Sequence, residues 1–217
     1  MEGMAMAATK GARQAQETGG RVPAERTAAA ILYVELRNFT RLSDVLDPER
    51  VLQLASAFFS LAGVAVKAQG GEVVSLQNDA LVAAFRAGKP AQSAGQAIQA
   101  AQALLRDFGP VGERWQNDYG LAARLSAGVH LGDTIFGMAG PQGGEQYLAF
   151  GDTVSIAERL LHRARAGEIV LSAEVATALG AATTAGLGAK PLPPLDLGRR
   201  PALPIFGILR ETRLDFT

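Results

Sequence analysis

The sequence predicts an α+β domain in which helices cover a mostly antiparallel sheet. A near-continuous apolar run over residues 28–36 is typical of a central strand that is covered on both faces. Residues 48–68 then have the apolar spacing of a helix, and residues 72–85 contain two strand-like runs. The order of strand, helix, hairpin, helix and strand favours a ferredoxin-like sheet backed by helices.

The first helix is predicted from its start signal and its periodicity. Asp47 is a typical N-cap residue, and Pro48 is favoured at the first helical position. Apolar residues then recur at helical spacing, and we expect them to face the sheet: Val51, Leu54, Phe58, Leu61 and Ala65. Gly70 and Gly71 end this helix.

A hairpin and a second helix follow. Strands are predicted over residues 72–77 and 80–85, joined by Asn78 and Asp79, which tolerate the positive φ of a tight turn. Residues 91–108 are Ala-rich and predict a helix that packs closely against the sheet. Its apolar face is formed by Ala94, Ile98, Ala101 and Leu105.

The middle of the chain is expected to return to strands. We expect a strand over residues 121–131, a turn at Gly132 and Asp133, and a returning strand over residues 134–138. Another short strand is expected over residues 147–150.

The C-terminal part is expected to contain a helix, short elements and a long loop. Asp152 or Thr153 is a suitable cap for a helix that runs to about Arg165. Residues 181–204, which are rich in Gly and Pro, are predicted to form a loop. The remaining elements are a strand over residues 168–171, a short helix over residues 173–179 and a last strand over residues 205–209.

Composition limits the partners of this chain. Its 217 residues correspond to about one domain, and its 21 basic and 21 acidic side chains cancel. The chain therefore lacks the excess of basic residues that nucleic acid or an anionic membrane would attract, and neither partner is expected.

The absence of cysteine excludes disulfides, thiolate zinc sites and a cysteine nucleophile. The first 26 residues have no uninterrupted apolar segment of the kind a signal peptide or membrane span needs. We therefore expect a cytoplasmic protein, with a flexible tail over residues 1–27, one domain over residues 28–210 and a C-terminal tail over residues 211–217.

Five segments, in this order, resemble the class III nucleotidyl cyclase domain, over about residues 28–210. They are Glu35-Leu36-Arg37-Asn38-Phe39-Thr40, Gly70-Gly71 through Asn78-Asp79 to Phe85, Gly128-Val129-His130-Leu131-Gly132, Gly151-Asp152-Thr153-Val154-Ser155 through Arg159-Leu160, and Glu168-Ile169-Val170-Leu171-Ser172. The resemblance implies the fold of that family, but a fold alone does not establish a function.

In that family two metal ions bridge the triphosphate of ATP or GTP, and carboxylates hold them. The resemblance places the two metal-binding positions at Glu35 and Asp79, so Mg²⁺ or Mn²⁺ is the cofactor implied for an active enzyme. Glu35 stands where the family has Asp, and its carboxylate lies one methylene further out. Asp79 also has a purely structural interpretation as a turn residue after Asn78.

Other residues of the family site are replaced in this chain. The resemblance places base recognition at Ser75 and Leu148 and ribose contact at Ser155, and these side chains do not match the family. Leucine makes no hydrogen bond to a purine, and burying unpaired base groups costs about 1 to 3 kcal/mol each. Arg159 matches the arginine that stabilises transition-state charge, although a solvated or ion-paired helix residue is the alternative interpretation.

Two further patterns point to ordinary structure. Gly143-Gly144-Glu145-Gln146-Tyr147 resembles the signature of diguanylate cyclases only superficially, and a late loop is expected there. His130 alternates with apolar neighbours and lacks metal-ligand spacing to His162, so we expect it to be a core or interface residue.

Three functions follow from the resemblance and stay open. The first is a degenerate, non-catalytic signalling module that forms a homodimer, or a heterodimer with another cyclase-like domain, because family sites form across a dimer interface. The second is an adenylate or guanylate cyclase, active alone or with a complementary partner chain. The third is a sensor that binds ATP or GTP without turnover.

Overall fold

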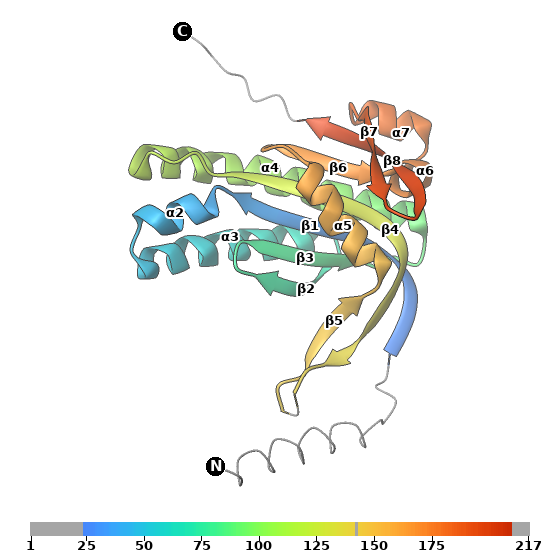
Figure 1. Cartoon of the computed structure of the whole chain (residues 1–217), viewed down its shortest axis with the longest axis horizontal. Coiled ribbons are helices and arrows are strands. Elements are labelled where there is room, and N and C mark those ends of the chain that lie inside the picture. The colour runs from blue at the N-terminus through green and yellow to red at the C-terminus, as the bar shows by residue number, and fades with distance from the viewer. Residues whose placement is uncertain (1–23, 142, 210–217) are drawn as a thin grey trace.

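Eight strands form one sheet in the computed structural model, which describes residues 24–141 and 143–209 (Figure 1). The strand order is β2-β3-β1-β4-β6-β8-β7, and β5 pairs with the end of β4. Among the described strands β4 and β6 pair in parallel, and the other neighbours are antiparallel. The strands are β1 (Ala24–Arg37), β2 (Glu72–Gln77), β3 (Ala80–Phe85), β4 (Arg124–Ala139), β5 (Gln146–Phe150), β6 (Glu168–Ser172), β7 (Lys190–Leu197) and β8 (Arg200–Leu209). The predicted α+β class is confirmed.

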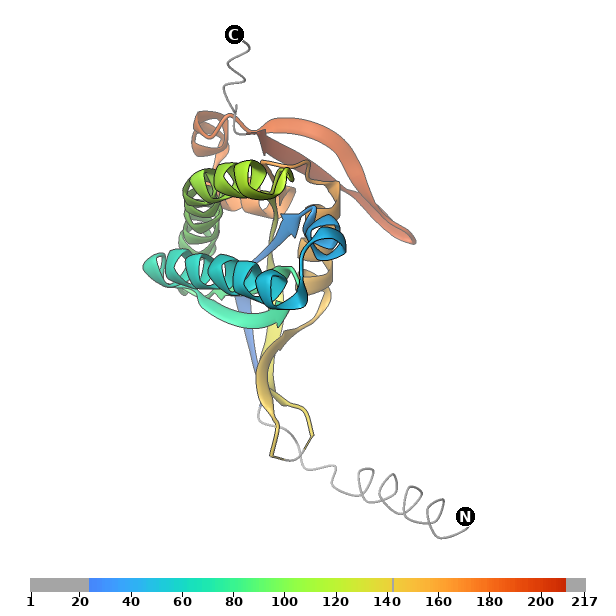
Figure 2. The same cartoon turned by 90° about the vertical axis from the view of Figure 1, so that its left-hand side faces the viewer.

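The helices lie on both faces of the sheet (Figures 1 and 2). They are α2 (Phe39–Val45), α3 (Pro48–Ala68), α4 (Pro90–Tyr119), α5 (Asp152–Arg163), α6 (Ala173–Leu179) and α7 (Ala181–Gly186). Alternate residues of β1 point to opposite faces. Leu32 and Val34 lie in the large core with α3 and α4, whereas Ile31 and Tyr33 lie in a second cluster with α5. The apolar run of β1 is therefore continuous because both faces of the strand are covered, as predicted.

Helix α3 begins as predicted, because the Asp47 carboxylate accepts a hydrogen bond of 2.8 Å from the Arg50 amide. By length and hydropathy alone α3 is apolar enough to cross a membrane. Of its most apolar stretch of 18 residues, 33% is buried inside the domain. Leu54, Phe58 and Val66 are among its buried residues and pack in the large core. The apolar face of α3 is therefore used within the fold.

Helix α4 continues to Tyr119, eleven residues beyond the predicted end, and contains Pro110 in its interior. Phe108 and Trp115 make an edge-to-face contact with ring centroids 5.5 Å apart, and both side chains are buried. This packing of the second half of the helix outweighs the helix-breaking tendency of proline.

Two expectations for the strands were wrong. Strand β4 runs unbroken through Gly132 and Asp133, where a turn was expected, because these residues pair with Ala29 and Ala28 of β1. Strand β1 itself begins at Ala24, four residues before the predicted start of this strand at residue 28. Most of the predicted tail over residues 1–27 and all of the predicted tail over residues 211–217 lie outside the described residues.

The loop predicted over residues 181–204 was also wrong, because this stretch forms α7, β7 and the start of β8. Strand β7 is the edge strand of the sheet and contains Pro191, Pro193 and Pro194. Proline has no amide hydrogen to donate to a neighbouring strand. A central strand is hydrogen-bonded on both sides, whereas an edge strand has one free side on which proline is accommodated. Composition alone therefore misidentified an edge strand as a loop.

Helix α5 crosses the sheet at Gly128 of β4. A Cβ atom at this position would overlap with the Ala157 carbonyl and the Leu161 amide of the helix. The predicted cap residues do not cap α5, since Gly151 occupies the N-cap position and the Thr153 hydroxyl donates to the Asp133 carbonyl at 2.6 Å. Close approach at Gly128 thus fixes how α5 lies on the sheet.

We predict that Gly128→Ala lowers the free energy of unfolding by about 1–3 kcal/mol, because the added methyl group overpacks the contact with α5. Urea unfolding measures this change. The matched control is Gly63→Ala in α3, where no atom lies within 4 Å of the added Cβ and helix propensity predicts a gain of about 0.5–1 kcal/mol. Equal stability of the Gly128→Ala variant and the wild type would contradict this account of the α5 contact.

Candidate functional site

Glu35 and Asp79 lie next to each other at one end of the sheet. Glu35 pairs with Ala80 in the β1–β3 register, and the Leu36 amide donates to the Asp79 carbonyl at 2.8 Å. Asn78, with a φ of 39°, makes the tight turn that was predicted between β2 and β3. The fold therefore brings together the two carboxylate residues that the sequence singled out.

Arg37 joins this end of β1 to α5. Its guanidinium donates to the Leu161 and Ala164 carbonyls at 3.0 and 2.9 Å and to the Ser126 hydroxyl at 2.9 Å. Cationic groups are favoured at a helix C-terminus, where carbonyl groups lack partners within the helix. The same guanidinium lies 3.5 Å from the Glu35 carboxylate, so it also balances part of that charge.

Tyr33 lies beneath the carboxylates, two residues before Glu35 on the same face of β1. It is buried, and its hydroxyl donates to the Gln77 amide oxygen at 2.7 Å. Burial raises the pKa of Tyr33, and the charges of Glu158, Glu35 and Asp79 raise it further, while the hydrogen bond to Gln77 acts in the opposite direction. On this face of the sheet, negatively charged side chains therefore surround the neutral phenol of Tyr33.

The two expected base-recognition residues do not lie on a common surface. Ser75 is half-buried on β2 and pairs with Val82, which lies in the cluster under α5. Leu148 pairs with Gly137 in the β4–β5 hairpin, so it points to the opposite side from its neighbour Ala149, which packs against the same cluster. Within one chain, these two positions do not form a pocket.

Ser155 and Arg159 lie one helical turn apart on the exposed side of α5, as their spacing predicted. The Arg159 guanidinium donates a hydrogen bond to the Asp196 carbonyl at the β7–β8 turn. Arg200 from the same turn forms a two-point ion pair with Asp152 at the start of α5. Arg159 is therefore engaged with the protein backbone.

His130 is buried, as expected, where β4 passes between α5 and α6. Its Nδ1 lies 2.8 Å from the Ser172 hydroxyl and 3.6 Å from the Glu174 carboxylate. Burial lowers the pKa of His130, while the nearby carboxylates of Glu174 and Asp152 oppose that shift. These contacts give His130 a structural role in joining the sheet to α6.

The carboxylates offer two protein ligands for a divalent cation. Over residues 24–141 and 143–209, no three His, Asp or Glu side chains gather closely enough to hold a metal ion by themselves. Glu35 and Asp79 have the oxygen donors that Mg²⁺ or Mn²⁺ prefers, but the Arg37 guanidinium competes for Glu35. The donor set therefore fits a cation only if a bound triphosphate, water or a partner chain completes it.

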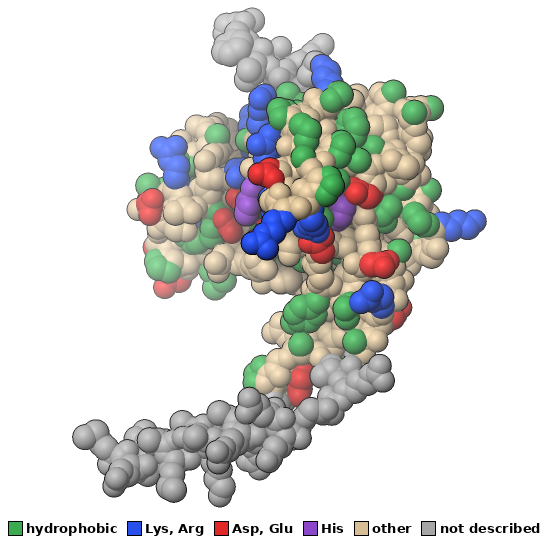
Figure 3. Space-filling model, turned by 45° about the vertical axis from the view of Figure 1, so that its right-hand side comes forward, with side chains coloured by type: hydrophobic (Ala, Val, Ile, Leu, Met, Phe, Trp, Pro, Cys, Tyr) green, Lys and Arg blue, Asp and Glu red, His purple; other side chains and the backbone are tan. Residues whose placement is uncertain are grey.

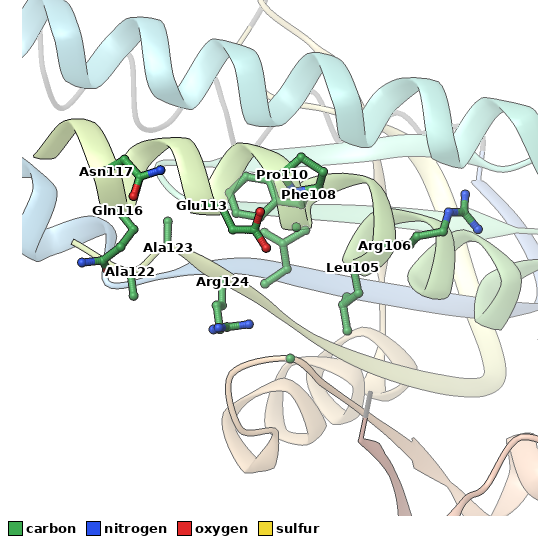
Figure 4. Close-up of a pocket in the computed structure, with 14 residues that line it drawn as sticks. Leu105, Arg106, Phe108, Pro110, Glu113, Gln116, Asn117, Ala122, Ala123 and Arg124 are labelled. Atoms are coloured by element: carbon green, nitrogen blue, oxygen red, sulfur yellow. The ribbon is translucent and has the colours of Figure 1, made fainter. Parts of the chain in front are cut away.

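A separate cavity of about 730 Å³ lies between the second half of α4 and the start of β4. Figure 4 shows Glu113 pointing from α4 toward β4, whereas Arg124 extends from the strand on the side away from the helix. Leu125, which lines the cavity, faces the α4 core, whereas Ser126 bonds Arg37 near Glu35. The cavity is therefore distinct from the carboxylate site.

Sequence reasoning missed the residues that connect the site. Tyr33 and Gln77 are 44 residues apart in the sequence, and Asp152 and Arg200 are 48 residues apart. The contacts of Arg37 with the end of α5 join residues 124 and 127 positions apart. A polar residue within an apolar strand, such as Tyr33, was the one available signal.

Comparison with known proteins identifies similar domains. The model of the adenylate and guanylate cyclase catalytic domain family matches residues 22–189. The chain is 30% identical over 147 residues to adenylate cyclase 1 of Rhizobium meliloti, covering 65% of this chain and 21% of that protein. It is 26% identical over 164 residues to a germination-specific adenylate cyclase of Dictyostelium discoideum, covering 73% of this chain and 18% of that protein. The chain thus spans about a fifth of the length of these relatives.

Solved structures of the same kind share the fold. The adenylyl cyclase CyaB from P. aeruginosa has a TM-score of 0.77 at 18% identity, covering 88% of this chain and 98% of that one. A guanylate cyclase domain from Catenaria anguillulae, solved in complex with GTP, has a TM-score of 0.71 at 17% identity, covering 87% and 100%.

We predict that Glu158→Gln lowers the pKa of Tyr33, because it removes the negative charge that contributes most to the upward shift after burial. Alkaline titration of phenolate absorbance measures this, and Tyr33→Phe assigns the signal among the three tyrosines. A raised pKa stabilises the folded state below about pH 10, and this contribution is lost as pH rises through the raised value. An unchanged Tyr33 titration in Glu158→Gln would contradict the described arrangement.

Proposed function

This chain belongs to the adenylate and guanylate cyclase catalytic domain family, and within that family we propose that it is a non-catalytic, dimeric signalling module of the cytoplasm. The carrying observation is that Arg159, the one matched residue for transition-state charge, is held by the Asp196 carbonyl. Loss of a single charge-stabilising group costs about 10²- to 10³-fold in rate. While this contact is closed Arg159 is withheld from a nucleotide, and together with the replaced base and ribose positions this supports a domain without turnover.

The replaced residues act in the same direction. The family resemblance implies Lys at position 75, Asp or Thr at 148 and Asn at 155. Ser75 lacks the charge of Lys, Leu148 has no hydrogen-bonding group for a purine, and Ser155 is shorter than Asn. Around Tyr33 the side chains of Glu35, Asp79 and Glu158 carry negative charge, and Arg37 is engaged by carbonyl groups. A triphosphate is itself strongly anionic, so this face is poorly suited to hold one without added cations.

A projecting arm supports the dimeric part of the proposal. The outer ends of β4 and β5 extend away from the body of the domain (Figures 1 and 2). Met138, Tyr147 and Phe150 on this arm are exposed, and hydrophobic side chains are visible on it in Figure 3. Arg86 lies 4.4 Å from the Phe136 ring centroid and holds the base of the arm. An apolar arm that projects from the body suits contact with a second cyclase-like domain.

One observation favours a second candidate, a working cyclase. Glu35 and Asp79 meet at the β1–β3 end as the metal-binding pair of the family would require. A complementary partner chain would then supply the base pocket, and Mg²⁺ or Mn²⁺ would bind between the carboxylates and the triphosphate. This candidate requires cyclic product that depends on both carboxylates.

We predict no cyclic product from any of the four nucleoside triphosphates with Mn²⁺ or Mg²⁺ above the background of a Glu35→Ala, Asp79→Ala double variant. Chromatography of the reaction products measures turnover. Product that appears with the wild type and disappears in the double variant would establish the cyclase instead.

Thermal unfolding in the same mixtures separates a sensor from a module that ignores nucleotides. A ligand at a hundred times its dissociation constant stabilises the folded state by about 2.7 kcal/mol. A shift with ATP or GTP in the absence of product would assign the chain as a nucleotide sensor, and the signalling module predicts no shift.

We predict that Met138→Ser with Phe150→Ser converts a dimer to monomers, because both changes remove exposed apolar area from the arm. Sedimentation equilibrium measures the association. The matched control is Leu52→Ser with Val64→Ser, which removes two exposed apolar side chains from α3. A wild type that stays monomeric at high concentration, or equal dissociation in the control, would contradict the role of the arm.

A further inference from the structure

The turn between β7 and β8 makes two polar contacts with α5. We call residues 196–200 the hairpin tip. The Asp196 carbonyl of the tip accepts from the Arg159 guanidinium, and Arg200 binds both carboxylate oxygens of Asp152, with Nη2 and Oδ1 3.0 Å apart. The two contacts lie at the two ends of the tip, so together they close it onto the helix.

The tip is held far less firmly than the rest of the hairpin. The side chains of Arg200 and Asp152 are 49% and 56% exposed, and exposed ion pairs of this kind contribute little to stability. Leu195 and Leu203, on either side of the tip, are buried in an apolar cluster with Leu160 of α5. The tip can therefore open locally while the hairpin stays attached to the domain.

Local backbone structure separates the tip from the paired strands. The β7–β8 register shifts between Leu195 and Leu197, at the point where the tip begins. Within the tip, the Asp196 carboxylate accepts a hydrogen bond of 2.8 Å from the Gly198 amide, and Gly198 has a φ of 70°. The tip is thus a small turn with its own internal hydrogen bond.

Asp152 is the negative charge on which this arrangement depends. The hydrogen bond from Arg200 lowers the pKa of Asp152, and the positive charges of Arg200 and Arg159 lower it further, together with His130. Figure 3 shows acidic and basic side chains gathered on the body of this face, above the arm. One carboxylate therefore balances two arginine side chains.

We propose that the hairpin tip is an autoinhibitory clasp. While it is closed, Arg159 is engaged by a backbone carbonyl and Arg200 by Asp152. Opening frees the Arg159 guanidinium on the exposed side of α5 and the Arg200 guanidinium on the tip, and each can then bind a polyphosphate group. The inference rests on the family correspondence that the proposed function also uses, in which Arg159 is the side chain that would face a nucleotide.

The closing contact can be removed without removing an arginine. Asp152→Asn deletes the counter-charge of Arg200 and leaves Arg159, Arg199 and Arg200 in place. The matched control is Asp118→Asn on α4, which makes the same change in net charge. Asp196→Ala is a second opening variant, because it removes the acceptor of the Gly198 amide and retains Asp152.

Two measurements on the full chain test the clasp. Hydrogen–deuterium exchange of residues 197–200 reports opening, and calorimetry with inorganic triphosphate reports release of the arginines. We expect exchange at the tip to rise and triphosphate to bind about two- to fivefold more tightly in both opening variants, with no change in the control. Thermal melting confirms that each variant is folded.

Each outcome decides the proposal. Unchanged tip exchange in both opening variants, or faster exchange with unchanged triphosphate affinity, overturns the clasp. Equal tightening in Asp118→Asn assigns the effect to net charge and overturns it as well. Neither hydrogen exchange nor calorimetry depends on turnover or on dimerisation. Failure of the proposed function would appear in the other experiments, as cyclic product in the turnover assay or as a monomer in sedimentation.

Discussion

The contact of Arg37 with the end of α5 is the interaction on which the candidate site depends. Arg37 comes from the central strand and binds two terminal carbonyl groups of the helix, while Gly128 lets the helix lie close to β4. Together they fix the position of α5 relative to β1. The side chains of Glu158 and Arg159 reach the carboxylate end and the β7–β8 turn only because α5 is held in this place.

The charges around this arrangement are one basis for the proposal of a domain without turnover. Negative charge surrounds the buried Tyr33, whereas the nearby cations are already bound: Arg37 by helix carbonyls and Arg159 by a turn carbonyl. A family member that turns over a nucleotide needs its cations free to meet phosphate oxygens. The present fold retains the scaffold of the family, and within it Arg37 and Arg159 make internal contacts.

The exposed surfaces around α5 differ in chemistry, and they suit different tasks. The β4–β5 arm presents Met138, Tyr147 and Phe150, which favour association with another protein. The β7–β8 turn presents an exposed ion pair, and the proposed clasp depends on the small stabilisation that such a pair contributes. Both adjoin the same helix, so association at the arm and opening at the turn can each affect it.

Local periodicity, caps and turn residues were enough to predict the α+β class, the β2–β3 hairpin and the start of α3. The resemblance to the cyclase family implied that Glu35 and Asp79 share one site. The sequence did not determine the unbroken β4, the length of α4 or the strands of the Pro-rich segment, where pairing and packing outweighed local breakers. The partners of Arg37, Arg159 and Arg200 depend on the tertiary fold, because each contact joins segments far apart in sequence. A side chain's type is local, but its availability depends on which distant atoms the fold places beside it.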